Sequence, residues 1–241
     1  MMILLVLGLT ASPLLTGAAF ADAKAPSPPE PWQIVPQAPA PNVPGSPQTP
    51  APTVPGGSGD INATEAGVAQ VVDGLWKKHF TENFPGRQYT SPRVAGAYVG
   101  TSGPRCGGAP SAPNNAFYCP AGDFLAWDQN LMTTGYQKIG DSWIYLVISH
   151  EWGHAIQNRI SRAQVSPAAE LQADCLAGAT LAGAQRDGTL KKDAGDDKEI
   201  ADTLTAVADK TPWTNSSSHG NAQQRIAAYN KGTQGGVKAC L

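Results

Sequence analysis

Residues 143–154 read Trp-Ile-Tyr-Leu-Val-Ile-Ser-His-Glu-Trp-Gly-His, and this stretch is the most informative about the fold of the chain. Its first six residues are apolar without a break, which predicts a buried helix. Three ionisable side chains follow: His150, Glu151 and His154. Because such groups are costly to bury without partners, the helix is expected to present them to a metal ion or to one another.

The spacing of the two histidines predicts a metal site. Residues four apart lie on one face of a helix, so the imidazoles of His150 and His154 converge on a point that Zn²⁺ can occupy at about 2.0–2.1 Å. Glu151 projects about 100° around the helix and can reach a metal-bound water without binding the metal. That position is the one a general base needs.

A catalytic zinc also needs a third protein ligand and one open position. Ser166 and Pro167 are typical of the N-cap and first residue of a new helix, in which Glu170 and Asp174 again lie four apart on one face. We therefore predict Glu170 as the third ligand. Asp174 is the predicted acceptor for the N–H group of a ligating imidazole, which fixes its tautomer.

Three motifs carry a resemblance: HEWGHAIQ at 150–157, ELQADCLAG at 170–178 and SHGNAQQR at 218–225. Together they resemble the bacterial neutral zinc metallopeptidase family, which shares the His/His/Glu ligand set of thermolysin-like gluzincins. The resemblance covers about residues 60–241. It implies one catalytic zinc at His150, His154 and Glu170, with Glu151 as catalytic base and a peptide or protein as substrate. It also implies that Tyr118-Cys119-Pro120 flanks the cleft and can pair with an extended substrate.

His219 lies outside the metal motifs and has two interpretations. It is a candidate donor to the negative charge that develops on the carbonyl oxygen during hydrolysis. The alternative is that His219 caps the helix Asn221–Lys231 or bonds to its neighbours. Arg225 is expected to share either task.

The flanking sequence predicts an α+β fold, a mostly helical zincin-like catalytic domain with a small antiparallel sheet. Asp60 or Asn62 is expected to cap a first helix that runs to about Phe80, with His79 a solvated cation at its end. Short β-favouring runs between 89 and 127, broken by Gly, Pro and Asn, predict the sheet. Further helices are expected at residues 141–163, 167–186, 197–209 and 221–231.

The first 59 residues are predicted to lie outside the folded domain at 60–241. Residues 1–21 are uncharged, mainly apolar and end in Ala19-Phe20-Ala21, which is typical of a secretory signal peptide. An uncleaved membrane anchor is the alternative, since no Lys or Arg precedes Lys24. Residues 22–59 are rich in proline, which lacks the amide donor and fixes φ, so we expect an extended linker that forms neither helix nor ladder.

Four cysteines suggest two disulfides that supplement a core in an exported chain. Cys106 and Cys119 flank a loop within the predicted sheet, which favours their pairing and leaves Cys175 with Cys240. Two other connectivities remain open. A zinc site made of four cysteines is the rival interpretation, but the chain has no CxxC motif to begin one.

Charge limits the choice of partners. A net charge of −2 offers no basic field for nucleic acid and no polybasic run for an anionic membrane. The sequence favours an exported peptidase, secreted or in the cell envelope. Two alternatives stay open: a catalytically silent binding protein of the envelope, and an amidase that acts on cell-wall peptide. Substrate, oligomeric state and activation do not follow from these patterns.

Overall fold

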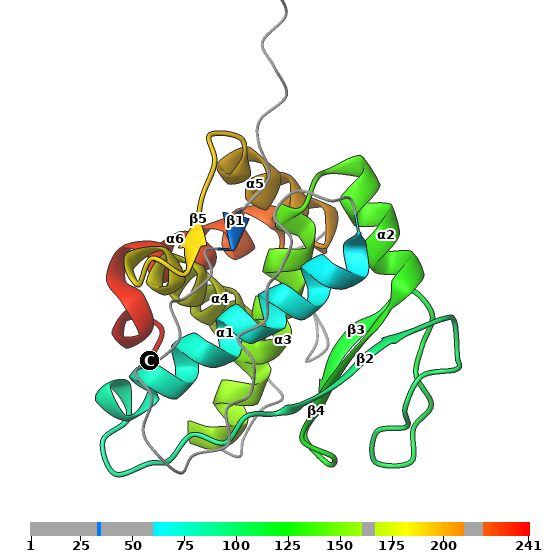
Figure 1. The fold of residues 1–241 in the computed structure, drawn as a ribbon, viewed down its shortest axis with the longest axis horizontal. Coiled ribbons are helices and arrows are strands. Elements are labelled where there is room, and N and C mark those ends of the chain that lie inside the picture. The colour runs from blue at the N-terminus through cyan, green and yellow to red at the C-terminus, as the bar shows by residue number, and fades with distance from the viewer. Residues whose placement is uncertain (1–32, 35–59, 161–166, 210–218) are drawn as a thin grey trace, which may run out of the picture.

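The computed structural model describes residues 33–34, 60–160, 167–209 and 219–241. The predicted signal peptide, most of the linker, the end of the helix predicted at 141–163, and Ser166 lie outside this part of the chain. Within it, helices dominate and are accompanied by a three-stranded sheet and a two-stranded ladder, which confirms the α+β class. Figure 1 shows the sheet on one side of the helical body and α6 on the other.

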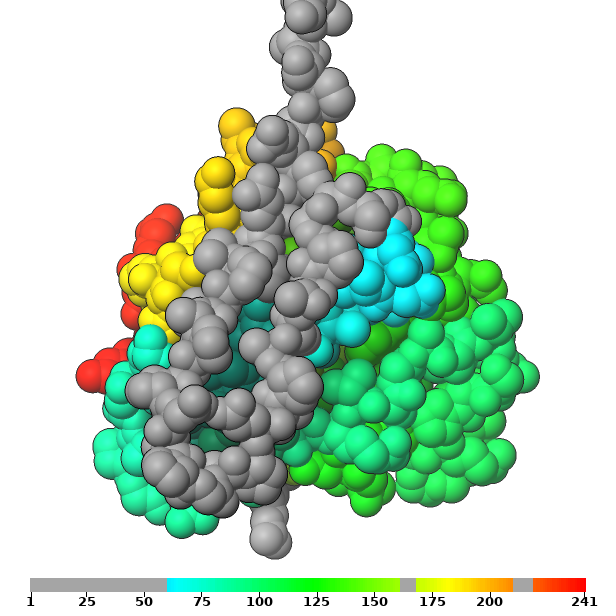
Figure 2. Space-filling view, viewed as in Figure 1, coloured from blue at the N-terminus to red at the C-terminus, as the bar shows by residue number. Residues whose placement is uncertain are grey.

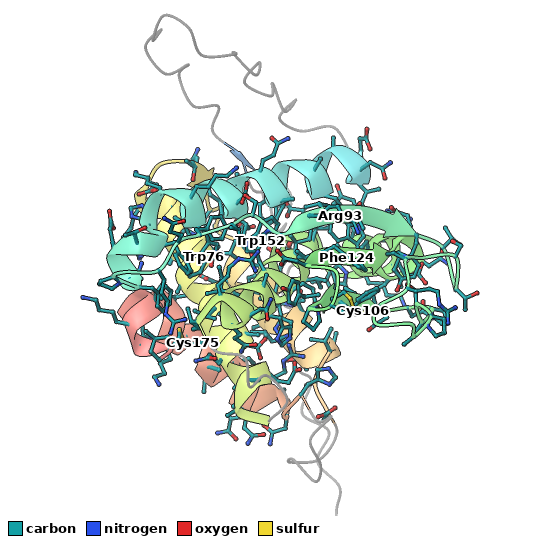
Figure 3. All side chains as sticks on the ribbon, turned by 90° about the horizontal axis from the view of Figure 1, so that it is seen from below. Trp76, Arg93, Cys106, Phe124, Trp152 and Cys175 are labelled. Carbon is teal, nitrogen blue, oxygen red and sulfur yellow. A yellow bond between two sulfur atoms is a disulfide. The ribbon has the colours of Figure 1, made fainter. Side chains whose placement is uncertain are left out.

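The first helix, α1, runs from Ile61 to Asn83. Of the two predicted N-caps, Asp60 and Asn62, the structure has Asp60. The Asp60 side chain accepts from the backbone N–H groups of Asn62 and Ala63. Apolar residues at three- and four-residue spacing bury one face of α1 against the helices behind it, and Figure 3 shows Trp76 and Trp152 on this inner side. The raised pKa of His79 fits the cation we expected, but the ring is only partly exposed and bonds to the carboxylates of Glu82 and Asp187, which cause the shift.

The sheet contains β2 (Arg93–Tyr98), β3 (Ala116–Cys119) and β4 (Phe124–Asp128) in the order β2-β4-β3. The strands lie where the sequence placed them, but the sheet is mixed: β3 is antiparallel to β4, and β2 is parallel to it. The prediction of a purely antiparallel sheet is therefore wrong. The reason is the segment 99–115, which crosses the end of β4 and so lets β4 lie between β2 and β3.

Helix α2 (Gln129–Lys138) follows β4 directly and was not predicted. Asp128 ends the strand and caps the helix by accepting from the N–H of Asn130. The short segment has few periodic apolar residues and contains Gly135, so its pattern is weak. In the space-filling view, α2 and the strands form one side of the molecule and the end of α6 the other (Figure 2).

The central helices are α3 (Ser142–Ile160) and α4 (Pro167–Arg186), followed by α5 (Asp196–Ala206) and α6 (Ala222–Ala239). Helix α5 ends earlier than the predicted 209, and α6 continues past the predicted Lys231. Gly232, the residue after the predicted end, lies inside the helix and allows close packing. A Cβ there would lie 1.8 Å from the carbonyl oxygen of Cys175 in α4, so only glycine allows the approach.

One part of the proline-rich segment forms a ladder, contrary to prediction. Gln33 and Ile34 make up β1, which pairs antiparallel with β5 (Leu190–Lys191). Both residues carry an N–H group, unlike the prolines around them, so they can donate to a neighbouring strand. The prediction that residues 22–59 form no ladder is wrong at these two positions.

Both predicted disulfides are present. Cys106 joins Cys119 in the sheet half of the molecule, and Cys175 joins Cys240 in the helical half, as the labels in Figure 3 show. The second bond ties the end of α6 to α4, and the Nε2 of Gln172 in α4 donates to the carbonyl of Cys240 at 2.8 Å. Across the described residues, none of the helices combines the length and apolar character that crossing a membrane would take.

Candidate metal centre

Helix α3 places His150 and His154 on one face. Their ring centroids lie 4.8 Å apart with the ring planes nearly perpendicular. The helix is buried for most of its length, and His150 and Glu151 are both among its buried residues. The long apolar run before His150 explains this position, because it packs the N-terminal half of α3 into the core.

Glu170, in the first turn of α4, brings a carboxylate oxygen to this face as the third candidate ligand atom. Its Oε2 lies 3.4 Å from the Nε2 of His150 and 3.6 Å from the Nε2 of His154. All three ligand atoms lie within 4.8 Å of one another. For tetrahedral zinc with bonds of about 2.0–2.1 Å, neighbouring ligand atoms are separated by about 3.4 Å. Both Glu170 distances fit that value.

The same Glu170 oxygen is buried and has no hydrogen-bond partner within the described residues. A buried carboxylate oxygen without a partner is costly, whereas a metal ion would satisfy it. The group of two imidazoles and one carboxylate, with neither thiolate nor further carboxylates, also suits zinc chemically. The residues therefore fit a zinc ion.

Close packing of α3 on α4 sets these distances. Gly153 stands between the ligand histidines and faces α4, where a Cβ would lie 2.9 Å from the carbonyl oxygen of Ala173. Any larger residue at Gly153 would push the two helices apart. The glycine inside the His-Glu-Trp-Gly-His motif thus brings the histidine helix to within reach of Glu170.

Asp174 lies one turn after Glu170 and contacts His150, as predicted. Its Oδ1 is 2.8 Å from the Nδ1 of His150. Because an ionised carboxylate only accepts, this bond keeps the proton on Nδ1 and directs Nε2 toward the metal position. Burial alone would raise the pKa of Asp174, but the charges of His150 and Arg225 outweigh it and hold the pKa below its ordinary value.

The sequence analysis assigned Arg225 to the wrong partner. It was expected to act with His219, but it is buried and binds Asp174 through two nitrogens, Nε to Oδ2 at 2.8 Å and Nη2 to Oδ1 at 2.7 Å. Its Nη1 donates to the carbonyl of Val207 at 2.9 Å, which links α6 to the end of α5. Arg225 therefore neutralises Asp174 and orients it toward His150.

The charges of the site are coupled. Burial opposes a positive charge on His150, but the carboxylates of Asp174 and Glu170 outweigh it and raise the pKa of His150 to about 10. Burial also opposes a charge on Glu170, yet the two histidines lower the pKa of Glu170 far below its usual range. The carboxylates thus favour a cation at this position, which a divalent metal ion supplies in place of a proton.

Glu151 is held by the sheet. Its Oε2 accepts from the backbone N–H of Tyr118 in β3 at 2.9 Å, and its Oε1 has no hydrogen-bond partner among the described residues. The Tyr118 hydroxyl in turn accepts from the Nδ2 of Asn158 in α3 at 2.7 Å. Tyr118 therefore ties strand β3 to helix α3 at two places, Glu151 and Asn158.

His219 lies at the rim of the site. Its Nε2 is 4.0 Å from the Oε2 of Glu170, and half of its side chain is exposed. The N–H groups of His219 and Gly220 both donate to Asp209. The cap of α6 is Asn221, in a capping box with Gln224, so His219 does not have the capping role that we considered.

A cavity of about 200 Å³ opens beside these residues. Its ionisable lining residues are His150, Glu151, His219 and Arg225. Its large apolar lining residues are Leu131, Trp143, Leu146, Val147 and Val207. Ala116 of β3 also lines the cavity, but Tyr118, Cys119 and Pro120, which were expected to flank the cleft, are not among the lining residues.

Fold and site together define the class of zincin-like proteins, with a His-Glu-x-x-His helix facing a carboxylate from the next helix. The chain belongs to the family described as "Putative neutral zinc metallopeptidase", which it matches over residues 45–240. This family implies zinc as the metal and a peptide or protein as substrate. No solved structure matches the chain.

Two relatives illustrate the family. "Uncharacterized protein YpfJ" of Escherichia coli K12 is 27% identical over 199 residues, which cover 71% of this chain and 67% of the relative. "Uncharacterized protein Rv2575" of Mycobacterium tuberculosis is 30% identical over 200 residues, covering 68% of this chain and 64% of the relative. The chain therefore spans about two thirds of the length of these relatives.

Proposed function

We propose that the chain is an exported zinc-dependent peptidase in which His150, His154 and Glu170 hold the metal and Glu151 is the general base. One observation carries the proposal: the buried Oε2 of Glu170, which has no hydrogen-bond partner among the described residues, lies 3.4 and 3.6 Å from the Nε2 atoms of the two histidines. Family membership supports the same reaction class.

The mechanism assigns one task to each polar group. When bound, zinc polarises the substrate carbonyl and lowers the pKa of water to about 7. Glu151 takes a proton from the attacking water on Oε1, since Oε2 is occupied by the N–H of Tyr118. The same carboxylic acid then gives that proton to the nitrogen of the departing amine, so Glu151 returns to its starting state.

His219 is suited to the negative charge that develops on the carbonyl oxygen. Its exposed Nε2 lies beside the Glu170 carboxylate at the rim of the cavity, where a donor could reach the substrate. The bonds from its backbone and from Gly220 to Asp209 hold the residue in place. A donor preorganised in this way stabilises the transition state more than the ground state.

The edge of β3 is suited to hold a peptide backbone. Tyr118 directs its N–H away from β4 toward Glu151. In an antiparallel ladder, alternate residues direct their backbone groups to the same side, so Ala116 also directs its groups away from β4. Since Ala116 lines the cavity, an extended substrate can pair with it there.

The apolar lining residues suit the cavity to an apolar substrate side chain. The whole cavity, about 200 Å³, exceeds the roughly 150 Å³ of a dry cavity that binds benzene. A leucine- or phenylalanine-sized group therefore fits. Export is supported by the two disulfides, since these bonds persist mainly in extracytoplasmic compartments.

The test is digestion of casein, an unfolded protein, by the purified zinc-loaded protein. We expect cleavage that a zinc chelator stops and added zinc restores. Stoichiometric zinc with no cleavage of casein or of a broad peptide library would contradict the proposal and favour a silent binding protein. Release of fragments from cell-wall peptide alone would favour an amidase instead.

A further inference from the structure

Gln157 lies three residues after His154 and is buried, with 3% of its surface exposed. Its amide makes two contacts that join the two ligand helices. The Nε2 donates to the carbonyl oxygen of Ala169 in α4 at 2.6 Å. The Oε1 lies 2.9 Å from the Nδ1 of His154.

These two contacts determine which nitrogen of His154 carries the proton. A backbone carbonyl only accepts, so the NH₂ group of Gln157 must face Ala169. The amide oxygen then faces His154, and because that oxygen also only accepts, Nδ1 of the imidazole must donate to it. A neutral imidazole has one N–H, so its Nε2 carries the lone pair, and this atom is the one that lies 3.6 Å from Glu170.

The second contact acts on the other helix. Ala169 directly precedes Glu170 in the first turn of α4, so the bond from Gln157 fixes the backbone beside the carboxylate ligand. One buried amide therefore joins a histidine ligand to the turn that carries the carboxylate ligand. Of the three proposed ligands, Asp174 contacts His150, and its negative charge is balanced by Arg225. Gln157 is neutral and therefore needs no counterion.

We propose that Gln157 is a positioning residue for the metal: it fixes His154 with its proton on Nδ1 and couples α3 to the turn of α4 that presents Glu170. This inference rests on the proposed zinc site. Removal of an outer partner of a metal ligand commonly weakens metal binding about 10- to 100-fold.

The experiment compares three variants of the full chain. Gln157→Leu removes both contacts and places an apolar side chain of comparable size in the buried position. Gln157→Glu keeps an acceptor for His154 but loses the donor to Ala169. The matched control is Gln172→Leu. Gln172 lies in α4, and its amide also donates to a backbone carbonyl, that of Cys240, which is not next to a proposed ligand.

Two quantities are measured: the zinc dissociation constant, by competition with a chelator of known affinity, and the nitrogen-coupled proton resonance of the His154 ring, by NMR at pH 8.5. We expect Gln157→Leu to bind zinc about 10- to 100-fold more weakly and to lose the protected Nδ1–H resonance. Gln157→Glu should keep this resonance and bind zinc at least ten times more tightly than the leucine variant. Gln172→Leu should match the wild type.

Wild-type zinc affinity in Gln157→Leu would overturn the inference while leaving the metal site intact. So would equal losses in the leucine and glutamate variants with an unchanged imidazole resonance, because these indicate a structural role only. A protonated Nε2 in the zinc-loaded wild-type His154 overturns it. If the wild type binds no zinc, the proposed function fails together with this inference. If the wild type binds zinc and only the Gln157 results differ from expectation, this inference alone fails. Should Gln157→Leu not fold, the glutamate variant and the wild-type resonance decide.

Discussion

Glu151→Gln is expected to lower peptide hydrolysis on the order of 10²–10⁴-fold while leaving zinc binding unchanged. The glutamine oxygen can still accept from the N–H of Tyr118, so the contact between β3 and α3 survives. An amide cannot take the proton from water, however, and the base is lost. The measurement is the rate of casein cleavage by equal amounts of zinc-loaded wild-type and variant protein.

The control for this variant is its zinc content and melting temperature, both of which should equal those of the wild type. Activity within a few-fold of the wild type would show that Glu151 is not the base. Loss of zinc together with activity would show that Glu151 contributes to the metal site itself, in contradiction to its bond with Tyr118.

Arg225→Met is expected to cost about 3–5 kcal/mol of stability, because it leaves the buried carboxylate of Asp174 without its cation. For a domain of this size the loss corresponds to roughly 6–20 °C in melting temperature. Thermal unfolding followed by circular dichroism measures it. Arg186→Met is the matched control, since Arg186 lies exposed at the end of α4, and its melting temperature should hardly change.

The double variant Arg225→Met with Asp174→Leu separates charge from structure. It should recover part of the lost stability, because no buried charge remains. Its zinc affinity should stay about 10- to 100-fold below the wild type, since the Nδ1 of His150 has lost its acceptor. An unchanged melting temperature in Arg225→Met alone would contradict the pairing of Arg225 with Asp174.

The proposed metal ligands were within reach of sequence analysis because each depends on local helical spacing. His150 and His154 lie one turn apart in one helix, and Glu170 follows the start signal of the next. The strand positions were likewise predictable from short β-favouring runs. Helix propensity and period are properties of neighbouring residues, and so they can be read directly from the chain.

Features that depend on distant contacts were missed. Arg225 is separated from Asp174 by 51 residues, and no local pattern links them. The continuation of α6 past Lys231 includes Gly232, whose close approach to Cys175 in α4 is a contact between distant residues. The parallel pairing of β2 with β4 and the ladder at Gln33 depend on how the connecting segments run. A partner for His154 could have been suspected from the sequence, because Gln157 is a polar residue in an apolar helix three positions after His154.

The central claim is that two imidazoles and one carboxylate share a zinc ion, and anomalous X-ray scattering at the zinc edge tests it most directly. In crystals grown with zinc, we expect the strongest anomalous peak about 2.0–2.2 Å from the Nε2 atoms of His150 and His154 and from a carboxylate oxygen of Glu170. A strongest peak elsewhere, such as among Asp141, Asp196 and Glu199, or no peak between the histidines, would contradict the claim.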